Sequence, residues 1–234
     1  TGQSTQKLVH YKNKIRSKFD VIIGLNFATK DFESELDFHM ILEKNPTRSY
    51  VEMNKPGAVY RKDLPRILNW KSLHHFPTDL NIIKATRSDF GGNPDICKYK
   101  KDFNEGFLIG PPDPQGLSVG SVALNALHFA CMLGCKHIYL IGADLIFKDS
   151  FDHYYNDNSY RKSKTKEANR SPIIKVPFKG KTCETTQFFL YSAEYIDKVI
   201  ETICNPLGLT VYDFSDGLLS KAVKIDLDNY FIGV

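Results

Sequence analysis

The sequence predicts an α/β fold in which a doubly wound, mostly parallel sheet carries helices on both faces. Short apolar runs alternate with stretches of helical periodicity, as βαβ units require. The run Ile138–Ile141 is apolar throughout rather than at every second residue, which is typical of a strand that is covered on both faces. Open parallel sheets bind ligands at the carboxyl ends of their strands. Residues that directly follow the apolar runs are therefore the first candidates for a functional site.

The stretch Ser118–Asp144 is predicted to form a loop, a helix and a buried strand. Ser118 is suited to cap the helix, whose apolar residues recur at helical spacing between positions 122 and 133. Gly134 stands where a helix ends on a left-handed residue. The strand Ile138–Ile141 follows, and it is succeeded by Gly142 and Asp144.

The other predicted elements alternate along the rest of the chain. A helix follows Ser4, and a Gly-Ser loop that opens a helix ordinarily follows a strand. We therefore expect the first strand of the fold to lie before Thr1, with a simple N-terminal helix as the alternative. The remaining predicted strands are Asp20–Leu25, Phe38–Leu42, Ser49–Met53, Leu80–Ile83, Phe107–Ile109 and Thr210–Phe214. The remaining predicted helices are Lys62–Leu68 and Thr185–Cys204, and Lys179–Lys181 is predicted to be a turn.

The length of 234 residues suits a single nucleotide-binding α/β domain over positions 1–234. Two segments interrupt it. A polar, glycine-punctuated stretch near 87–106 is predicted to be a surface excursion. The segment near 145–183 contains the basic run Arg161–Arg170, which has almost no apolar residues. We expect a mobile, lid-like segment there; a solvated loop with no function is the alternative.

Composition restricts the partners and the compartment. A net charge of +4 suits an anionic small ligand and does not indicate nucleic acid. Five cysteines, odd in number and without a CxxC pair, favour a reducing cytoplasm and free core thiols. No apolar run approaches the roughly 18 to 20 residues that cross a bilayer, so membrane association is expected to be peripheral at most. A homo-oligomer is compatible with all of this.

The strand-end rule predicts which polar residues meet at one edge of the sheet. Backbone N–H groups at Gly2, Ser4 and the start of the second helix would favour an anion there, and ordinary capping without a ligand is the alternative. Asn26 and Asn45 follow strands, where an amide can donate to a phosphate or simply form a turn. Glu43 is a rival of Asn45. The full predicted set is Gly2, Ser4, Asn26, Asn45, Ser118, Gly120, Ser121, Gly142, Asp144 and Ser215.

Asp144 has three readings at the end of its strand. It could accept a hydrogen bond from a ribose hydroxyl, hold a divalent ion or cap a neighbouring loop. Asp149 or Asp152 could share a Mg²⁺ ion with it, because hard cations take oxygen ligands. No strict Asp-x-Asp pair is present. We therefore expect that no cofactor is required and no dedicated metal site exists, with Mg²⁺ kept as an alternative.

The segment from Gly120 to Leu145 resembles the bacterial sialyltransferases of glycosyltransferase family 42. It is also similar to the motility accessory factor family and to the archaeal 6-hydroxymethylpterin diphosphokinases. The shared pattern is a Ser/Gly opening, a helix of small residues, Leu-Gly-Cys, a basic residue, Ile-Tyr-Leu and Gly-x-Asp. The tail Tyr212–Leu219 looks like the strand and turn that close the sialyltransferase nucleotide domain. The resemblance is absent between Tyr50 and Phe107.

This resemblance implies a Rossmann-like domain and transfer from a nucleotide-activated sugar. The expected donor is a CMP-activated acidic sugar, sialic acid-like or Kdo-like, and the expected acceptor is a glycan or protein hydroxyl. His153 would be the base, since imidazole titrates near neutral pH, and Tyr154 and Tyr155 would steady the leaving phosphate. The sialyltransferase histidine lies further downstream, where this chain has none between Arg161 and Cys183.

Plainer readings of these three residues stay open, namely an exposed loop histidine and two aromatic side chains that pack a loop. Two other functions stay open as well. One is a diphosphokinase of the hydroxymethylpterin type that uses ATP and Mg²⁺. The other is a nucleotide-binding module without catalysis that assists a partner enzyme.

Overall fold

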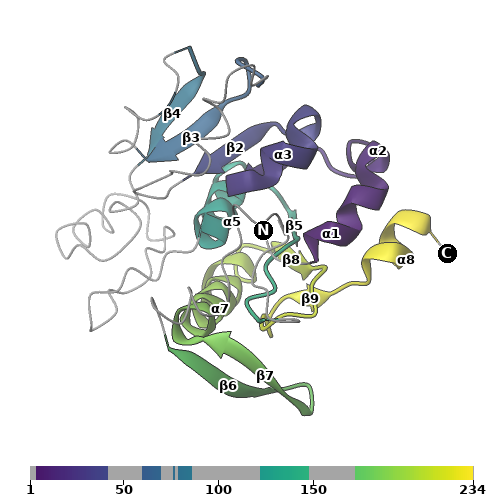
Figure 1. Ribbon diagram of the computed structural model, residues 1–234, viewed down its shortest axis with the longest axis vertical. Coiled ribbons are helices and arrows are strands. Elements are labelled where there is room, and N and C mark those ends of the chain that lie inside the picture. The colour runs from purple at the N-terminus through teal and green to yellow at the C-terminus, as the bar shows by residue number, and fades with distance from the viewer. Residues whose placement is uncertain are drawn as a thin grey trace. The chain divides into compact units, whose positions relative to one another are not determined.

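The computed structural model describes residues 4–41, 60–69, 76, 79–85, 122–147 and 172–233 (Figure 1). The chain divides into two compact units: one combines Thr1–His10 with Leu127–Val234, and the other is Tyr11–Ala126. This division does not test the single nucleotide-binding domain, which stays a prediction. The predicted strands Ser49–Met53 and Phe107–Ile109, the excursion near 87–106 and the basic run Arg161–Arg170 lie outside the described residues.

The unit Tyr11–Ala126 contains a four-stranded parallel sheet in the order β1-β2-β3-β4. Its strands are β1 (Ile23–Leu25), β2 (Phe38–Ile41), β3 (Arg66–Asn69) and β4 (Ile82–Ala85). Three of them overlap predicted strands. Each strand pairs in parallel with the next one along the chain.

The predicted helix Lys62–Leu68 is wrong, because Arg66 to Leu68 belong to strand β3. Pro65 explains the error in physical terms: within a helix it would remove a backbone donor and collide with the preceding turn. Arg66 instead pairs with His39 on one side and with Ile82 on the other. Leu68 is fully buried. The short buried run that follows Pro65 is therefore the beginning of a strand.

Short helical turns lie on either side of β1. The helix α2 (Lys12–Ile15) precedes it, and three turns connect it to β2, namely η2 (Asn26–Ala28), α3 (Thr29–Phe32) and η3 (Glu33–Glu35). Gly24 on β1 allows Leu36 to pack closely, since a Cβ there would lie 2.3 Å from the Leu36 Cδ1 atom. Arg16 and Asp37 form a two-pronged ion pair at 2.7 Å, which ties α2 to the start of β2.

The other unit contains a three-stranded parallel sheet in the order β5-β8-β9. The strands are β5 (His137–Leu140), β8 (Thr210–Asp213) and β9 (Val223–Lys224). Helix α5 (Val122–Met132) precedes β5, and Gly134 ends it with a φ of +77°, as the sequence predicts. The helix α1 (Thr5–Leu8) at the start of the chain also belongs to this unit.

The second long helix is α7 (Gln187–Val199), which continues as the π-helical turn η6 (Ile200–Cys204) before β8. The predicted helix Thr185–Cys204 is therefore confirmed from Gln187 onward. Thr186 caps it, because its side chain accepts a hydrogen bond from the Phe189 N–H. Helix α8 (Leu227–Ile232) follows β9.

An antiparallel hairpin that the sequence reading missed precedes α7. It consists of β6 (Ile173–Phe178) and β7 (Lys181–Thr186), joined at the predicted turn. Two contacts fasten its base to the segment that follows β5. The Phe147 N–H donates to Glu184 O at 2.9 Å, and the Thr185 hydroxyl donates to Leu145 O at 2.6 Å. The helix α7 follows β7 directly, and the Gln187 N–H at its start donates a hydrogen bond to Pro172 O, just before β6.

The predicted α/β class with mostly parallel strands is confirmed: both larger sheets are parallel, and among the described strands only those of the hairpin pair antiparallel. Within the described parts of the chain, no helix has the length and apolar character needed to cross a membrane.

Candidate functional site

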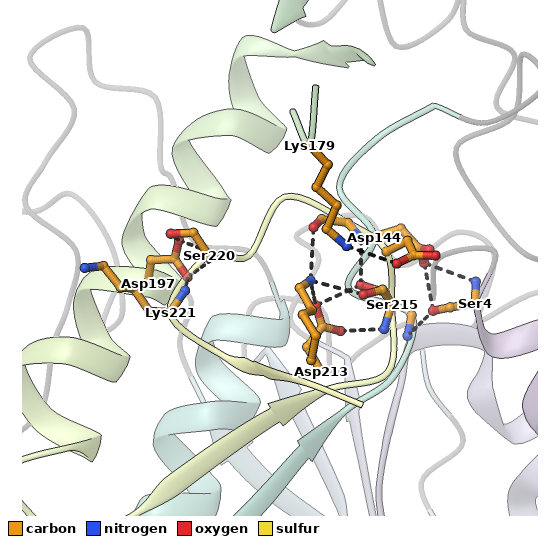
Figure 2. Close-up of polar contacts among 12 residues, drawn as sticks. Ser4, Asp144, Lys179, Asp197, Asp213, Ser215, Ser220 and Lys221 are labelled. Atoms are coloured by element: carbon orange, nitrogen blue, oxygen red, sulfur yellow. Dashed lines mark hydrogen bonds and ion pairs between the residues drawn. The ribbon is translucent and has the colours of Figure 1, made fainter. Parts of the chain in front are cut away.

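Ser4 connects the first helix to the carboxyl end of β5. Its hydroxyl accepts a hydrogen bond from the Gly142 N–H and donates one to Asp144 Oδ2, both at 2.9 Å. Its backbone N–H donates to the same carboxylate oxygen at 3.1 Å. Asp144 is only 2% exposed, and Gly142 has a φ of +78°. The structure shows Asp144 in the third of its three readings, as a carboxylate that holds the loop in front of α1 (Figure 2), and its roles toward a ribose or an ion stay predictions.

Asp213 organises the equivalent position on β8. It is fully buried and accepts hydrogen bonds from Ser215 N at 2.8 Å and from the Ser215 hydroxyl at 2.9 Å. The Lys224 ammonium donates to Asp213 Oδ2 at 2.5 Å, and also to the backbone oxygens of Ser215 and Gly217. Burial raises the pKa of Asp213 above its usual value, and the neighbouring ammonium opposes that rise.

Gly217 joins the two strand ends. A Cβ at this position would lie 2.0 Å from the Asp144 carbonyl oxygen, so only glycine allows the approach. The next residue, Leu218, donates its N–H to that oxygen at 3.1 Å. The residues at the ends of β5 and β8 thus form one hydrogen-bonded unit. We call it the strand-end cluster: Ser4, Gly142, Asp144, Asp213, Ser215, Gly217 and Lys224.

Two further carboxylates flank the loop that follows β8. Asp197 on α7 accepts hydrogen bonds from the Ser220 N–H, the Ser220 hydroxyl and the Lys221 N–H, which fixes the far end of this loop. Asp216, at the near end, is exposed and pairs with Lys179 at the tip of the hairpin, with 3.1 Å between Nζ and Oδ1. Figure 2 shows Lys179 reaching from the hairpin toward the strand-end cluster.

Stacked aromatic rings support the paired strands beneath this cluster. Tyr139 on β5 and Tyr212 on β8 lie 4.7 Å apart with an interplanar angle of 14°. Tyr230 on α8 contacts both Tyr139 and Phe214. Burial and a hydrogen bond with Tyr230 raise the pKa of Tyr139 to about 12. The phenol therefore stays neutral and acts as packing for the strand pair.

The structure brings together Ser4, Gly142, Asp144 and Ser215 of the predicted set. Asn26 lies in the other unit, at the end of β1, with a φ of +50°. The rest of the prediction lies outside the described residues: Gly2, Asn45, Ser118, Gly120, Ser121 and the proposed catalytic residues His153, Tyr154 and Tyr155. Their roles stay predictions.

Sequence reasoning missed three members of the strand-end cluster. Asp213 did carry a signal in the sequence, as a charged residue at the end of a strand and two positions before a serine. An aspartate in such a place often accepts a hydrogen bond from the backbone N–H two residues further on. Gly217 carried a weaker signal, as the glycine of a polar turn. Lys224 carried none, because its partners are set by the parallel pairing of β8 with β9.

A second buried polar group lies in the unit Tyr11–Ala126. The Nε2 atom of His39 donates to Asn26 O at 2.6 Å, and burial lowers the pKa of His39 to about 4. Arg66, its neighbour on β3, is fully buried and pairs with Glu33 at 2.7 Å. The neutral imidazole avoids placing a second positive charge next to this guanidinium.

No three His, Cys, Asp or Glu side chains gather closely enough to hold a metal ion in the described segments. Asp149 and Asp152, the suggested partners of Asp144 for Mg²⁺, lie outside those segments. The Cys131 and Cys204 thiols lie 3.8 Å apart as free cysteines inside the fold.

Comparison with known proteins gives a likeness in fold. No family model matches the sequence, and no curated protein matches it significantly. Among solved structures, the chain is similar to a MAf glycosyltransferase from Magnetospirillum magneticum AMB-1, with a TM-score of 0.59 and 15% sequence identity. The likeness covers 100% of this chain and 33% of that one, so the chain spans about a third of the length of the structure it matches. It supports the Rossmann-like α/β fold.

Proposed function

We propose that this chain is the nucleotide-binding and catalytic part of a nucleotide-sugar-dependent glycosyltransferase. The observation that carries the proposal is the likeness of its whole fold to a MAf glycosyltransferase. The sequence pattern between Gly120 and Leu145 resembles that of the same class of enzyme, and it supports the proposal independently of the fold. The donor we propose is a CMP-activated acidic sugar, and the acceptor is a hydroxyl of a glycan or a protein.

The strand-end cluster supports a donor site at the carboxyl ends of β5 and β8, where parallel sheets bind ligands. The buried carboxylates of Asp144 and Asp213 hold loops at these strand ends, which makes the site rigid. The Ser215 hydroxyl likewise donates to Asp213 and accepts from the Gly217 N–H. Such pre-organised loops let a ligand bind without ordering the chain first.

In the proposed reaction, the acceptor hydroxyl oxygen forms a bond to the anomeric carbon of the sugar while the bond from that carbon to the phosphate oxygen breaks. His153 takes the hydroxyl proton, and CMP leaves with the bonding electrons. Tyr154 and Tyr155 donate hydrogen bonds to the departing phosphate. The proposed nucleotide contacts remain the predicted set, namely Gly2, Ser4, Asn26, Asn45, Ser118, Gly120, Ser121, Gly142, Asp144 and Ser215.

Calorimetric titration with CMP, CDP, UDP, GDP and ATP, each with and without Mg²⁺, tests the proposal. Metal-independent binding of CMP in preference to the others is the expected result. Binding of ATP that requires Mg²⁺ would instead point to the diphosphokinase reaction. A protein that binds none of the five nucleotides would refute both enzymatic functions.

A His153→Ala variant tests the proposed base separately from donor binding. We expect it to keep the wild-type affinity for CMP and to lose about 100-fold or more of the transfer rate, the usual contribution of a general base. His10→Ala, which removes an exposed histidine outside the proposed site, is the matched control. An unchanged transfer rate in His153→Ala would exclude this residue as the base.

A further inference from the structure

The hairpin turn between β6 and β7 carries a lysine where the backbone favours a different residue. Phe178 pairs with Lys181, which leaves a two-residue turn of Lys179 and Gly180, with φ angles of +49° and +73°. Two positive φ angles define a type I′ turn, whose first position prefers Asn, Asp or Gly. A lysine in this conformation is uncommon and disfavoured. The conformation of the turn therefore does not explain why this position is a lysine.

The position of the hairpin tip is set by its base. Thr185 and Glu184 hydrogen-bond to Leu145 and Phe147, the residues that directly follow Asp144. The tip then approaches the loop that follows β8, where the Lys179 ammonium contacts Asp216 across 37 positions of sequence (Figure 2). Ser215 and Gly217, on either side of Asp216, are fixed by the strand-end cluster. The ammonium is thus held at the rim of that cluster.

The side-chain contacts of Lys179 do not explain the lysine either. Lys179 and Asp216 are 51% and 81% exposed, and ion pairs in such positions stabilise proteins very little. The ammonium also lies 5.4 Å from the centroid of the Phe178 ring, a contact that contributes only weakly at an exposed site. An ammonium has three N–H donors. Lys224, the other cation at this edge among the described residues, directs its three hydrogen bonds to Asp213, Ser215 and Gly217. Lys179 is the cation there that can turn to an incoming anion at small cost.

We propose that Lys179 binds a phosphate group at the rim of the strand-end cluster, and that Asp216 holds its ammonium in place until that group arrives. This inference rests on the proposed function for the identity of the ligand, because the phosphate is then that of the nucleotide donor. A charge-assisted hydrogen bond from lysine to phosphate offsets negative charge on the bound nucleotide and on the departing CMP.

Lys179→Asn separates this role from a structural one. Asparagine before glycine is the preferred type I′ sequence, so the melting temperature should stay the same or rise by about 2 °C. Binding is measured by calorimetry with CMP and with cytidine, which lacks the phosphate. We expect Lys179→Asn to lower CMP affinity about tenfold or more, as loss of a charged hydrogen bond does, with cytidine affinity unchanged. Lys181→Asn, the same change at the next exposed lysine of the hairpin, should leave both affinities intact.

The outcomes distinguish this inference from the proposed function. CMP affinity that is equal in the wild type and in Lys179→Asn overturns the role of Lys179 and leaves the transferase standing. If the wild type binds neither CMP nor cytidine, the proposed donor is refuted. Titration with inorganic pyrophosphate then decides whether Lys179 forms a phosphate site. The phosphate site is supported if the wild type and Lys181→Asn bind pyrophosphate and Lys179→Asn does not. It is overturned if the wild type does not bind pyrophosphate.

Discussion

Replacing Lys224 by methionine removes the positive charge from the strand-end cluster while keeping most of the side-chain volume. The change leaves the fully buried Asp213 carboxylate without its cation, and it leaves the backbone oxygens of Ser215 and Gly217 without a donor. The two hydrogen bonds from Ser215 to Asp213 remain. The expected effect is therefore a large loss of stability with the fold retained.

The size of the loss follows from the burial of the pair. Breaking a buried ion pair from one side costs about 3 to 5 kcal/mol. The Lys224 side chain is 28% exposed, and water can reach its end, so we expect about 3 kcal/mol at pH 8. The pKa of Asp213 already lies above its value in the unfolded chain, and it rises further in the variant. Protonation of Asp213 then favours the folded state, so the deficit shrinks as the pH falls.

Urea denaturation at pH 8 and pH 5 measures this effect as a difference in unfolding free energy between the variant and the wild type. Asp213→Asn combined with Lys224→Met should recover most of the loss, because the uncompensated charge is then gone. Lys221→Met is the control, since it removes an exposed lysine paired with Glu201 and should cause no measurable change. A cost below about 1 kcal/mol for Lys224→Met at pH 8 would refute the reasoning.

Two further predictions concern space and protonation. Gly217→Ala should cost about 3 kcal/mol in thermal unfolding because its Cβ would collide with the Asp144 carbonyl. Gly208→Ala, which has a φ of +71° and open space around it, should cost only about 1 kcal/mol, and equal costs would contradict this. His39 has a pKa of about 4 in the folded protein, below its ordinary 6.5, so stability should fall by up to about 3 kcal/mol as the pH drops from 6.5 to 4. Urea denaturation of His39→Gln should show a flatter profile over that range; an identical profile would show that other groups control it.

The sequence predicted the elements whose signal is local. The strands β2, β5 and β8 coincide with short, mostly apolar runs and were found to within a residue or two. The hairpin was missed because β7 is Lys-Thr-Cys-Glu-Thr-Thr, with no apolar run and an exposed first half. Its stability comes from pairing with β6 and from the contacts at its base, which lie far away in sequence. Strand β3 was misread because a short apolar run fits either structure, and Pro65 was given too little weight.

The candidate site shows the same limit. Ser4, Asp144 and Ser215 follow from the rule that strand ends converge, which needs only the chain order of the strands. The work that each residue does there depends on distances that sequence does not contain. Asp144 was open to a ribose, an ion or a loop, and the contact with the loop became visible only as the 2.9 Å distance to the Ser4 hydroxyl. Lys224 required the register of β9 against β8.

The hydrogen bonds at the base of the hairpin hold both ends of the segment 148–171. Phe147 and Pro172, which border the segment 148–171, are both hydrogen-bonded to the stretch Glu184–Gln187. The two ends of that segment are thereby held by a part of the chain outside it. The positions of these two ends therefore do not depend on the residues between them, which include His153, Tyr154 and Tyr155.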